Sequence, residues 1–458
     1  MSNWKSSRRR YSLSWAVLFL LMAAPALGGA VYTDLFEFDC AKNGCNGGQP
    51  GLLAQGEDGI LYGTLQSGTV KSAYGTVFDY TPGGAVSTLH RFQGDDGFSP
   101  QSGLSLGFDG AFYGTTTNGG PLRMGTVFKL SGGRVKVLYK FTDGADGAYP
   151  WAPPIQTPDG NLYGVTYTGT AYKIKPNGNF ATIATLPSKS QAPLLMATDG
   201  NFYGTSQSGG TFNQGTVFRL SVKGKLTIIH NFDASTEGAT PIGPVMEATD
   251  GKLYGTTAAG GSLSQGIVYQ LTTNGAYDVL HNFQDTTEGS GSVSGLVQAS
   301  DNYLYSVMPA GGANGYGTLY RINTTGTKFK VLHTFDSPTG AYPASTPTLY
   351  TDGTLYGLTL KGGTQENGAN GVLFSFTNGF KPFVALQLWA GSVGTTVGIL
   401  GQGFSAATGV NFGNVAATFN VVNDTYMTAT VPAGATTAKV TVLETSGSLA
   451  TLRKFKVL

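Results

Sequence analysis

The acidic residues of several loops are the side chains whose types and spacing could carry chemistry. Asp95 and Asp96 lie in one loop and Asp143 and Asp146 in a later one, and further acids recur at Asp233, Glu237, Asp285 and Glu288. Oxygen-rich loops can hold Ca²⁺, and two carboxylates that converge on one glycosidic bond can hydrolyse it. Asp and Gly are also ordinary turn residues. Calcium binding, catalysis and turn formation therefore all stay open, and calcium is the only cofactor that the sequence suggests.

Aromatic residues accompany these acids at Phe98, Tyr149, Trp151 and Tyr342. Aromatic rings beside hydrogen-bonding loops suit the stacking of carbohydrate, because the ring is a large apolar surface. Tyr149 and Tyr342 each precede a proline, however, and such pairs could instead fasten neighbouring parts of the fold together. We take as ligand-binding candidates Asp95, Asp96, Asp143, Asp146, Tyr149, Trp151 and Tyr342.

The four histidines are weaker candidates for a functional site than the loop acids and aromatic residues. His90, His230, His281 and His333 all occupy the same place in a recurring V-L-H-x-F motif. Equivalent positions of a repeat lie far apart, so these side chains cannot converge on one metal ion. We expect a structural role for them and predict no metal site and no catalytic residue.

A long internal repeat must position all of these residues. The segment D-G-x-[LF]-Y-G-T recurs with its tyrosine at Tyr62, Tyr113, Tyr163, Tyr203, Tyr254, Tyr305 and Tyr356, at separations of 51, 50, 40, 51, 51 and 51 residues. Each repeat contains four short β-branched or aromatic runs between turn residues, which is typical of a four-stranded blade. Seven such units predict an all-β protein with a seven-bladed β-propeller. We expect the tyrosine to be a packing residue and the glycine after it to let a neighbouring blade approach.

The loops of this predicted propeller differ in length. The links between the first and second strands and between the third and fourth are tight Gly-containing turns, whereas the other links are long. In an antiparallel meander alternate links fall on one face, so the long loops share a face, which is the candidate binding surface. The third repeat is shorter by 11 residues, all lost from loops on this face. We therefore predict a notch in the rim there.

The innermost strands of the repeats argue against catalysis. Glu247 is the only charged residue among them. General acid–base hydrolysis of sugars needs two converging carboxylates, which such a wall cannot supply alone. The start of the chain is also informative, because residues 31–38 contain a further copy of the V-L-H-x-F motif, at Leu35–Phe38, and are expected to supply the outer strand that completes the last blade. The alternative is that residues 380–386 fill it.

The N-terminal segment and the composition indicate export. Residues 1–30 combine a basic start (Lys5, Arg8, Arg9, Arg10) with a short apolar stretch, as in a signal peptide, and an N-terminal membrane anchor is the alternative. Cys40 and Cys45 are the only cysteines and are expected to form a disulfide in an oxidising compartment. The formal net charge of +2 gives no argument for a nucleic-acid partner, and no later segment could span a membrane.

The D-G-N-[LF]-Y-G-T, G-T-V-F and V-L-H-x-F series resembles the GloVer tandem repeats of exported bacterial proteins, the "choice-of-anchor" repeat family. The resemblance implies an extracytoplasmic repeat domain, at the bacterial cell surface or released, over residues 31–382, and implies no reaction. Residues 383–458 resemble an IPT/TIG domain through V-G-I-L-G-Q-G-F and M-T-A-T-V-P-A-G, which implies a small immunoglobulin-like β-sandwich.

These expectations favour a secreted, non-catalytic binding or scaffold protein that recognises a glycan or a protein through the long-loop face. An extracytoplasmic polysaccharide hydrolase or lyase that uses the loop carboxylates is the second hypothesis. A structural surface component is the third.

Overall fold

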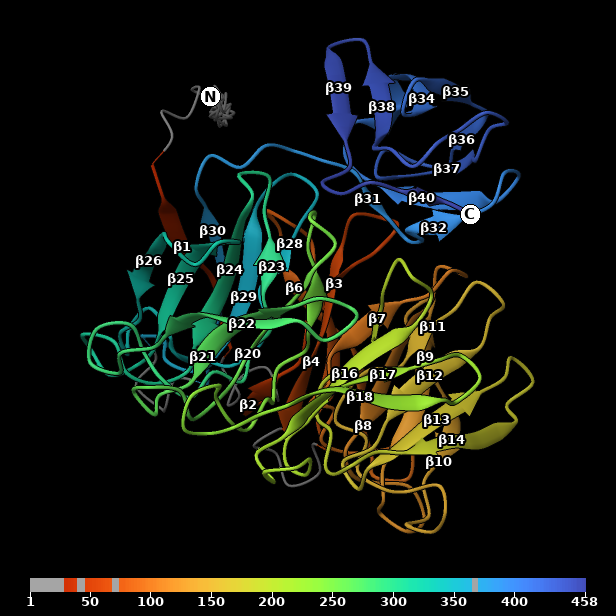
Figure 1. Cartoon of the computed structure of the whole chain (residues 1–458). Helices are drawn as coiled ribbons and strands as arrows, with labels where there is room; N and C mark the ends of the chain where they lie inside the picture. The colour runs from red at the N-terminus through yellow and green to blue at the C-terminus, as the bar shows by residue number, and fades with distance from the viewer. Residues whose placement is uncertain (1–28, 39–45, 68–73, 365–369) are drawn as a thin grey trace, which may run out of the picture.

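The computed structural model describes residues 29–38, 46–67, 74–364 and 370–458 of the chain (Figure 1). These residues form β-strands and one short 3-10 helix, η1 (Phe404–Ala406). In this described part of the chain, no helix has the length and apolar character needed to cross a membrane. The signal-peptide prediction for residues 1–30 falls almost entirely outside the described residues, and Cys40 and Cys45 lie outside them as well.

Seven antiparallel sheets follow one another along the repeats. Sheet 1 contains β2 (Asn46–Pro50), β3 (Ala54–Gln55), β4 (Leu61–Ser67), β5 (Thr76–Tyr80) and β6 (Val86–Arg91). Sheet 2 contains β7 (Leu104–Leu106), β8 (Phe112–Thr116), β9 (Thr126–Ser131) and β10 (Arg134–Lys140). Sheet 3 contains β11 (Ile155–Gln156), β12 (Leu162–Val165), β13 (Thr170–Ile174) and β14 (Phe180–Thr185). Sheet 4 contains β15 (Leu195–Met196), β16 (Phe202–Ser206), β17 (Thr216–Leu220) and β18 (Leu226–Asn231).

The remaining repeats give three further sheets of the same kind. Sheet 5 contains β19 (Met246–Glu247), β20 (Leu253–Thr256), β21 (Ile267–Leu271) and β22 (Tyr277–Asn282). Sheet 6 contains β23 (Val297–Gln298), β24 (Tyr303–Met308), β25 (Thr318–Asn323) and β26 (Phe329–Thr334). Sheet 7 contains β27 (Ala341–Pro343), β28 (Thr348–Leu349), β29 (Leu355–Lys361), β30 (Val372–Thr377) and the N-terminal β1 (Val31–Glu37).

The repeated D-G-x-[LF]-Y segment forms the turn between the first two strands of a sheet. In sheet 5, one oxygen of Asp250 accepts the backbone N–H of Lys252 (3.1 Å) and the other accepts the hydroxyl of Tyr254 (2.6 Å). Gly251 has a φ of 78°, a left-handed conformation that glycine adopts without strain. The same Asp–Tyr hydrogen bond occurs in sheets 1, 2, 4 and 6. One short segment thus supplies both the turn and the bond that fixes it.

The glycine after the tyrosine leaves room for an aromatic ring of its own sheet. A Cβ atom added to Gly255 would lie 2.3 Å from the hydroxyl oxygen of Tyr269, which faces it across the pairing of β20 with β21. Phe78, Phe128, Phe218 and Phe374 lie equally close to the equivalent glycines. The expectation that this glycine admits a neighbouring blade was therefore wrong, because the space is filled by a ring of the third strand.

Each sheet packs against the next through its own apolar cluster, and the last packs against the first. The cluster between sheets 4 and 5 includes Tyr203, Phe232 and Tyr269, and five further clusters join the other consecutive sheets. The seventh cluster joins Leu358 and Leu373 of sheet 7 to sheet 1. Burial of these large rings and aliphatic side chains is the main stabilising contribution.

The N-terminal strand completes sheet 7. β1 pairs antiparallel with β30, from Val31 opposite Thr377 to Glu37 opposite Val372. The alternative that residues 380–386 fill this place was wrong, because β31 (Ala385–Leu386) pairs instead with β33 (Thr396–Leu400).

The C-terminal residues form a separate sandwich whose two sheets share one apolar core. One sheet contains β31, β33, β37 (Tyr426–Thr430) and β36 (Phe419–Val421), and the other contains β35 (Val415–Ala417), β34 (Ala407–Phe412), β38 (Val440–Glu444) and β39 (Gly447–Ala450). A parallel pair, β32 (Ala390–Gly391) and β40 (Lys456–Val457), adds to it. Figure 1 shows this domain, in blue, against one end of the repeats.

Candidate functional site

The carboxylate of Asp146, one of the predicted ligand-binding acids, accepts hydrogen bonds from nearby residues of the same chain segment. It is buried and accepts hydrogen bonds from the hydroxyl of Tyr139 (3.0 Å), the backbone and hydroxyl of Thr142 (2.9 and 2.6 Å) and the backbone of Gly144 (3.1 Å). Burial alone would raise the pKa of this carboxyl, but these donors outweigh it and hold the pKa below its usual value. Asp146 therefore closes a turn.

Asp96 has a similar position one sheet earlier. It accepts the backbone N–H of Gln93 (2.8 Å) and pairs with Nε2 of His90 (2.8 Å). Partial burial raises the pKa of Asp96, and the bonds from His90 and Gln93 outweigh it, so the net shift is downward. Asp95 and Asp143 are exposed. Among the described residues, no group of three or more His, Cys, Asp or Glu side chains could hold a metal ion.

The histidines pack neighbouring sheets together, as the sequence predicted. Each of three stacks flat on a ring from the next sheet: His230 on Tyr277 (3.8 Å between centroids), His281 on Phe329 (4.1 Å) and His333 on Tyr32 (3.7 Å). Burial lowers the pKa of His230 to about 4. These contacts lie between different pairs of sheets, so the imidazoles form no common site.

Tyr149 and Tyr342 fasten long loops. Each has a φ of 57°. Each also donates its backbone N–H to a carbonyl in a loop of the preceding sheet, at 2.9 Å: Tyr149 to Met124, and Tyr342 to Tyr316. Lys361 lies over the ring of Tyr342 at 5.7 Å. These tyrosines are thus held in equivalent places on two sheets, and the structure does not bring them together.

Trp151 lies elsewhere, in a cavity of about 270 Å³ where the loops lead into the first strands of the sheets. We call this cavity the mouth. Loops of all seven sheets contribute to it, through Gly51, Leu52, Gln101, Ser102, Trp151, Gln191, Ala192, Pro193, Gln207, Ile242, Pro244, Val293, Ala344, Ser345 and Thr346. Of the ligand-binding residues predicted from the sequence, Trp151 alone is among them.

The polar groups of the mouth are neutral. None of the residues that line it is charged, and the side-chain oxygens of Gln101 and Gln207 are buried without a hydrogen-bond donor among the described residues. A buried acceptor without a donor is costly unless a ligand or water supplies one. The lining of the mouth therefore combines amide groups with one indole ring.

The shortened third repeat lies beside Trp151. The link between β12 and β13 spans only residues 166–169, and Tyr167 within it stacks on Trp151 at 5.5 Å between centroids. Lys189, in the other shortened link, lies over Tyr167 at 4.9 Å. The deletions thus leave an aromatic pair at the edge of the mouth.

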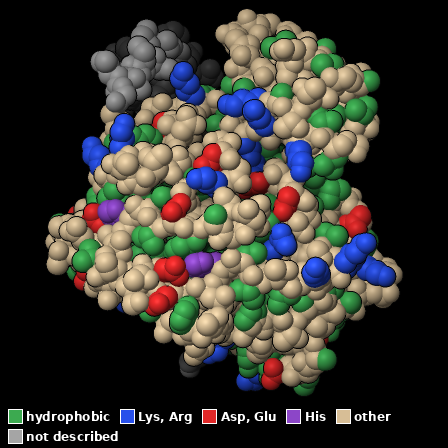
Figure 2. Space-filling view, viewed as in Figure 1, with side chains coloured by type: hydrophobic (Ala, Val, Ile, Leu, Met, Phe, Trp, Pro, Cys, Tyr) green, Lys and Arg blue, Asp and Glu red, His purple; other side chains and the backbone are tan. Residues whose placement is uncertain are grey.

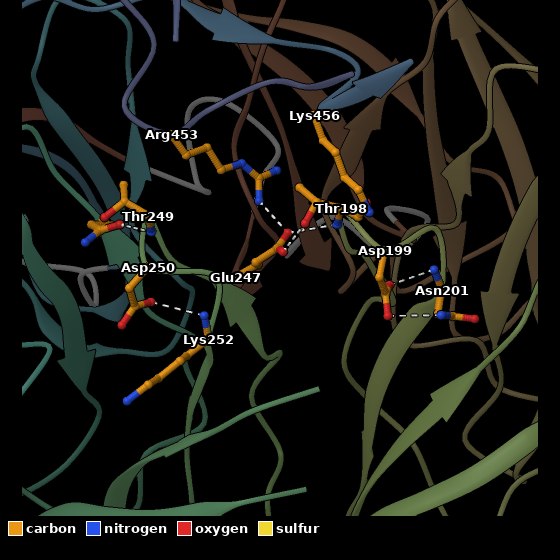
Figure 3. Close-up of polar contacts among 10 residues, drawn as sticks. Thr198, Asp199, Asn201, Glu247, Thr249, Asp250, Lys252, Arg453 and Lys456 are labelled. Atoms are coloured by element: carbon orange, nitrogen blue, oxygen red, sulfur yellow. Dashed lines mark hydrogen bonds and ion pairs between the residues drawn. The ribbon is translucent and has the colours of Figure 1, made fainter. Parts of the chain in front are cut away.

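The opposite end of the first strands is covered by the C-terminal domain. Arg453 donates from Nη1 to a carboxylate oxygen of Glu247 at 2.8 Å, and Glu247 also accepts the backbone N–H of Thr198 (3.0 Å) (Figure 3). Glu247 is 4 % exposed, and the guanidinium of Arg453 lies 4.0 Å from the ring centre of Trp389. Burial lowers the pKa of Arg453 to about 10, although the nearby carboxylate opposes this. Figure 3 shows Arg453 and Lys456 both directed at this end of sheets 4 and 5.

This pair explains the one charge in the innermost strands. At the same place in other sheets, a glutamine oxygen accepts a backbone N–H of the preceding sheet: Gln55 from Thr351 (3.1 Å), Gln156 from Phe108 (2.7 Å) and Gln298 from Thr249 (2.8 Å). Glu247 keeps this bond to Thr198 and adds an ion pair to the other domain. The carboxylate therefore joins two domains and is not free for catalysis.

Sequence patterns missed two parts of this arrangement. The glutamines of the mouth belong to links of different length, so no regular spacing connects them. Glu247 and Arg453 are 206 residues apart and lie in different domains. The only available signal was the isolated charge of Glu247 itself.

Comparison with known proteins matches the repeats to the Gloeobacter/Verrucomicrobia repeat over residues 26–195 and 189–419, which together cover most of the chain. The chain belongs to the Gloeobacter/Verrucomicrobia repeat family. Its C-terminal residues 383–456 match the IPT/TIG domain. The suspected membership and the suspected C-terminal module are both confirmed.

No curated protein matches this repeat-family chain. Among solved structures it is similar to a fungal alcohol oxidase of the AA5 family in complex with copper, with a TM-score of 0.50 and 14 % identity over 94 % of this chain and 100 % of that one. It is also similar to the extracellular domain of a putative one-component system, BT4673, from B. thetaiotaomicron, with a TM-score of 0.52 and 10 % identity. That match covers 90 % of this chain and 51 % of the other. At such identities the likeness concerns the fold alone.

Proposed function

We propose that this chain is an exported, non-catalytic binding protein, built as a closed seven-bladed β-propeller, whose mouth binds a neutral glycan. The propeller is supported by seven sheets of four or five strands that pack in a cycle, in which sheet 7 packs on sheet 1 and contains the N-terminal strand. The IPT/TIG domain and the likeness to an extracellular domain agree with a place outside the cytoplasm.

The observation that carries the glycan proposal is the chemistry of the mouth. The amide side chains of Gln101, Gln191 and Gln207 suit the many hydroxyl groups of a sugar, because an amide can both donate and accept hydrogen bonds, and Trp151 offers an apolar ring to one face of it. The absence of charge among the lining residues favours a neutral ligand over an acidic one.

The hydrolase hypothesis has weaker support. Asp146 accepts three hydrogen bonds from its loop and one from Tyr139 of β10, and Asp96 pairs with His90. Asp143, in the same loop as Asp146, is exposed and has a left-handed backbone conformation, with a φ of 63°. No described carboxylate among the mouth residues is placed to act on a ligand bound there.

A glycan array followed by calorimetry on the neutral glycans that bind tests this proposal. Trp151→Ala is expected to weaken binding at least tenfold, because truncation of a tryptophan that anchors a binding site typically costs about 2 kcal/mol or more and about 1.4 kcal/mol is a factor of ten. Phe212→Ala is the matched control, since Phe212 is an exposed aromatic residue outside the mouth. Product analysis of the same mixtures checks for turnover.

Saturable binding that Trp151→Ala weakens and Phe212→Ala preserves, without products, supports the proposal. Turnover that is lost in Asp143→Asn would instead establish the hydrolase. Binding that is equally strong in Trp151→Ala would place the glycan away from the mouth.

A further inference from the structure

A second cavity, of about 570 Å³, lies between sheets 2 and 3 away from the mouth, and its charged lining is mostly cationic. Lys129, Arg134 and Lys136 come from β9 and β10, and Lys175 comes from the turn after β13. Asp109 is the one carboxylate in the lining, and it accepts a hydrogen bond from Lys129 at 2.7 Å. Figure 2 shows several Lys and Arg side chains, with acidic ones between them, on the side of the molecule where Figure 1 places sheets 2 and 3.

The cavity lies at a junction that lacks a contact present at three other junctions, and the turn glycines of sheets 1 and 2 (Gly83, Gly132 and Gly133) lack it as well. At three junctions the glycine of the turn after the third strand lies against a backbone carbonyl of the preceding outer strand. An added Cβ atom would lie 2.4–2.7 Å from that oxygen, for Gly224 on Ile183, Gly275 on Ile229 and Gly326 on Leu280. Gly178 holds this place in sheet 3, and nothing lies within 4 Å of its added Cβ atom. Leu138, which the turn would otherwise cover, lines the cavity instead.

The charges on the sheet 2 wall are poorly compensated. Lys129 and Lys136 face each other across the pairing of β9 with β10, and Arg134 occupies the next position on the same side. Like charges directly opposite each other in a sheet are destabilising. Asp109 compensates Lys129, but in the described part of the chain no carboxylate forms an ion pair with Arg134, Lys136 or Lys175. An anionic ligand would relieve this repulsion.

We propose that this cavity binds an acidic oligosaccharide, whose carboxylate or sulfate groups pair with Arg134, Lys136 and Lys175. Its volume lies within the range of small-molecule sites and exceeds what a single inorganic anion fills. Arg134 and Lys136 lie on the sheet 2 wall and Lys175 on the sheet 3 wall, so a ligand with more than one anionic group can contact both sheets. Leu138 and Ile174 supply apolar surface for the faces of a sugar ring. This site is separate from the mouth and does not depend on the glycan proposed there.

The test uses the full chain and calorimetry in about 0.15 M salt, where weak surface charge effects are screened. The probes are trigalacturonate, a sulfated disaccharide, neutral cellotriose and a trinucleotide of single-stranded DNA. Lys136→Ala combined with Lys175→Ala is expected to weaken binding of the acidic saccharides at least tenfold. The matched control is Lys223→Ala with Lys225→Ala, which removes the same charge near the closed junction of Gly224. The two acidic probes distinguish carboxylate from sulfate recognition.

A second variant separates binding from folding. Lys136→Glu places opposite charges across the β9–β10 pairing, so it is expected to abolish binding while the melting temperature stays the same or rises. Trp151→Ala is expected to leave this site unchanged, so the failure of one proposal would not be mistaken for the failure of the other. The proposal is overturned if no acidic saccharide binds, if the trinucleotide binds as tightly, or if both double variants weaken binding equally.

Discussion

The two ends of the first strands are built from opposite chemistry. At one end the mouth is neutral, open and lined by loops of all seven sheets, and two of its amide oxygens have no donor within the described residues. At the other end Glu247 and Arg453 form a buried ion pair beneath the C-terminal domain. Buried and satisfied polar groups fix a structure, whereas polar groups around an open cavity can bind a ligand. The covered end of the first strands therefore contributes to stability, and the mouth is the end suited to binding.

The largest effect is expected from Arg453→Ala, at the covered end. It leaves the Glu247 carboxylate buried without its partner, which typically costs about 3–5 kcal/mol of unfolding free energy. Denaturant unfolding measures this change. Arg453→Met combined with Glu247→Gln restores the glutamine found at this place in other sheets and is expected to recover most of the loss. A single variant as stable as the unmodified protein would show that the domains are held by other contacts.

A smaller loss is expected from Tyr254→Phe. The hydroxyl donates to Asp250 in the turn at the covered end, and a hydrogen bond to a charged group is worth about 1.5–3 kcal/mol. Because the ring remains, the packing between sheets is kept, and Tyr254→Ala should cost about 3–5 kcal/mol because it removes the ring as well. Equal stabilities of the two variants would mean that the ring contributes nothing beyond its hydroxyl.

Acid is expected to weaken the outer strands rather than either end. Burial holds the pKa of His230 at about 4 in the folded protein, below the value of about 6.5 for an unfolded chain. As the pH falls from about 6.5 towards 4, His230 becomes protonated in the unfolded chain but stays neutral in the folded protein. The free energy of unfolding therefore decreases across that interval. His230→Phe can still stack on Tyr277 and should flatten the dependence of melting temperature on pH there. Parallel curves for both proteins would contradict this.

The smallest effect on stability is expected at the mouth. Trp151 is half-buried and contacts Tyr167, so Trp151→Ala should cost about 1 kcal/mol or less in unfolding free energy. A loss comparable to that of Arg453→Ala would make Trp151 a structural residue and would remove the distinction between the two ends.

Much of the fold could be predicted from the sequence because its determinants are local. The D-G-x-[LF]-Y segment contains its own turn, and the Asp and Tyr that bond to each other are four residues apart. Residues 31–38 contain a copy of the V-L-H-x-F motif, and β1 forms over residues 31–37 of that segment. The candidate site was harder to predict, because the sequence does not show that Asp146 accepts a hydrogen bond from the backbone N–H of Thr142 in its own loop. The partners of Glu247 and the residues that surround Trp151 come from distant segments of the chain, so no local sequence pattern predicts them.

One measurement tests the account most directly, because Trp151 lies at the mouth and Trp389 at the covered end. In fluorine NMR of the chain labelled with 5-fluorotryptophan, with resonances assigned by single Trp→Phe variants, a bound neutral glycan should shift the Trp151 signal and leave the Trp389 signal in place. A shift confined to Trp389 would contradict the account, as would saturable binding that moves neither signal.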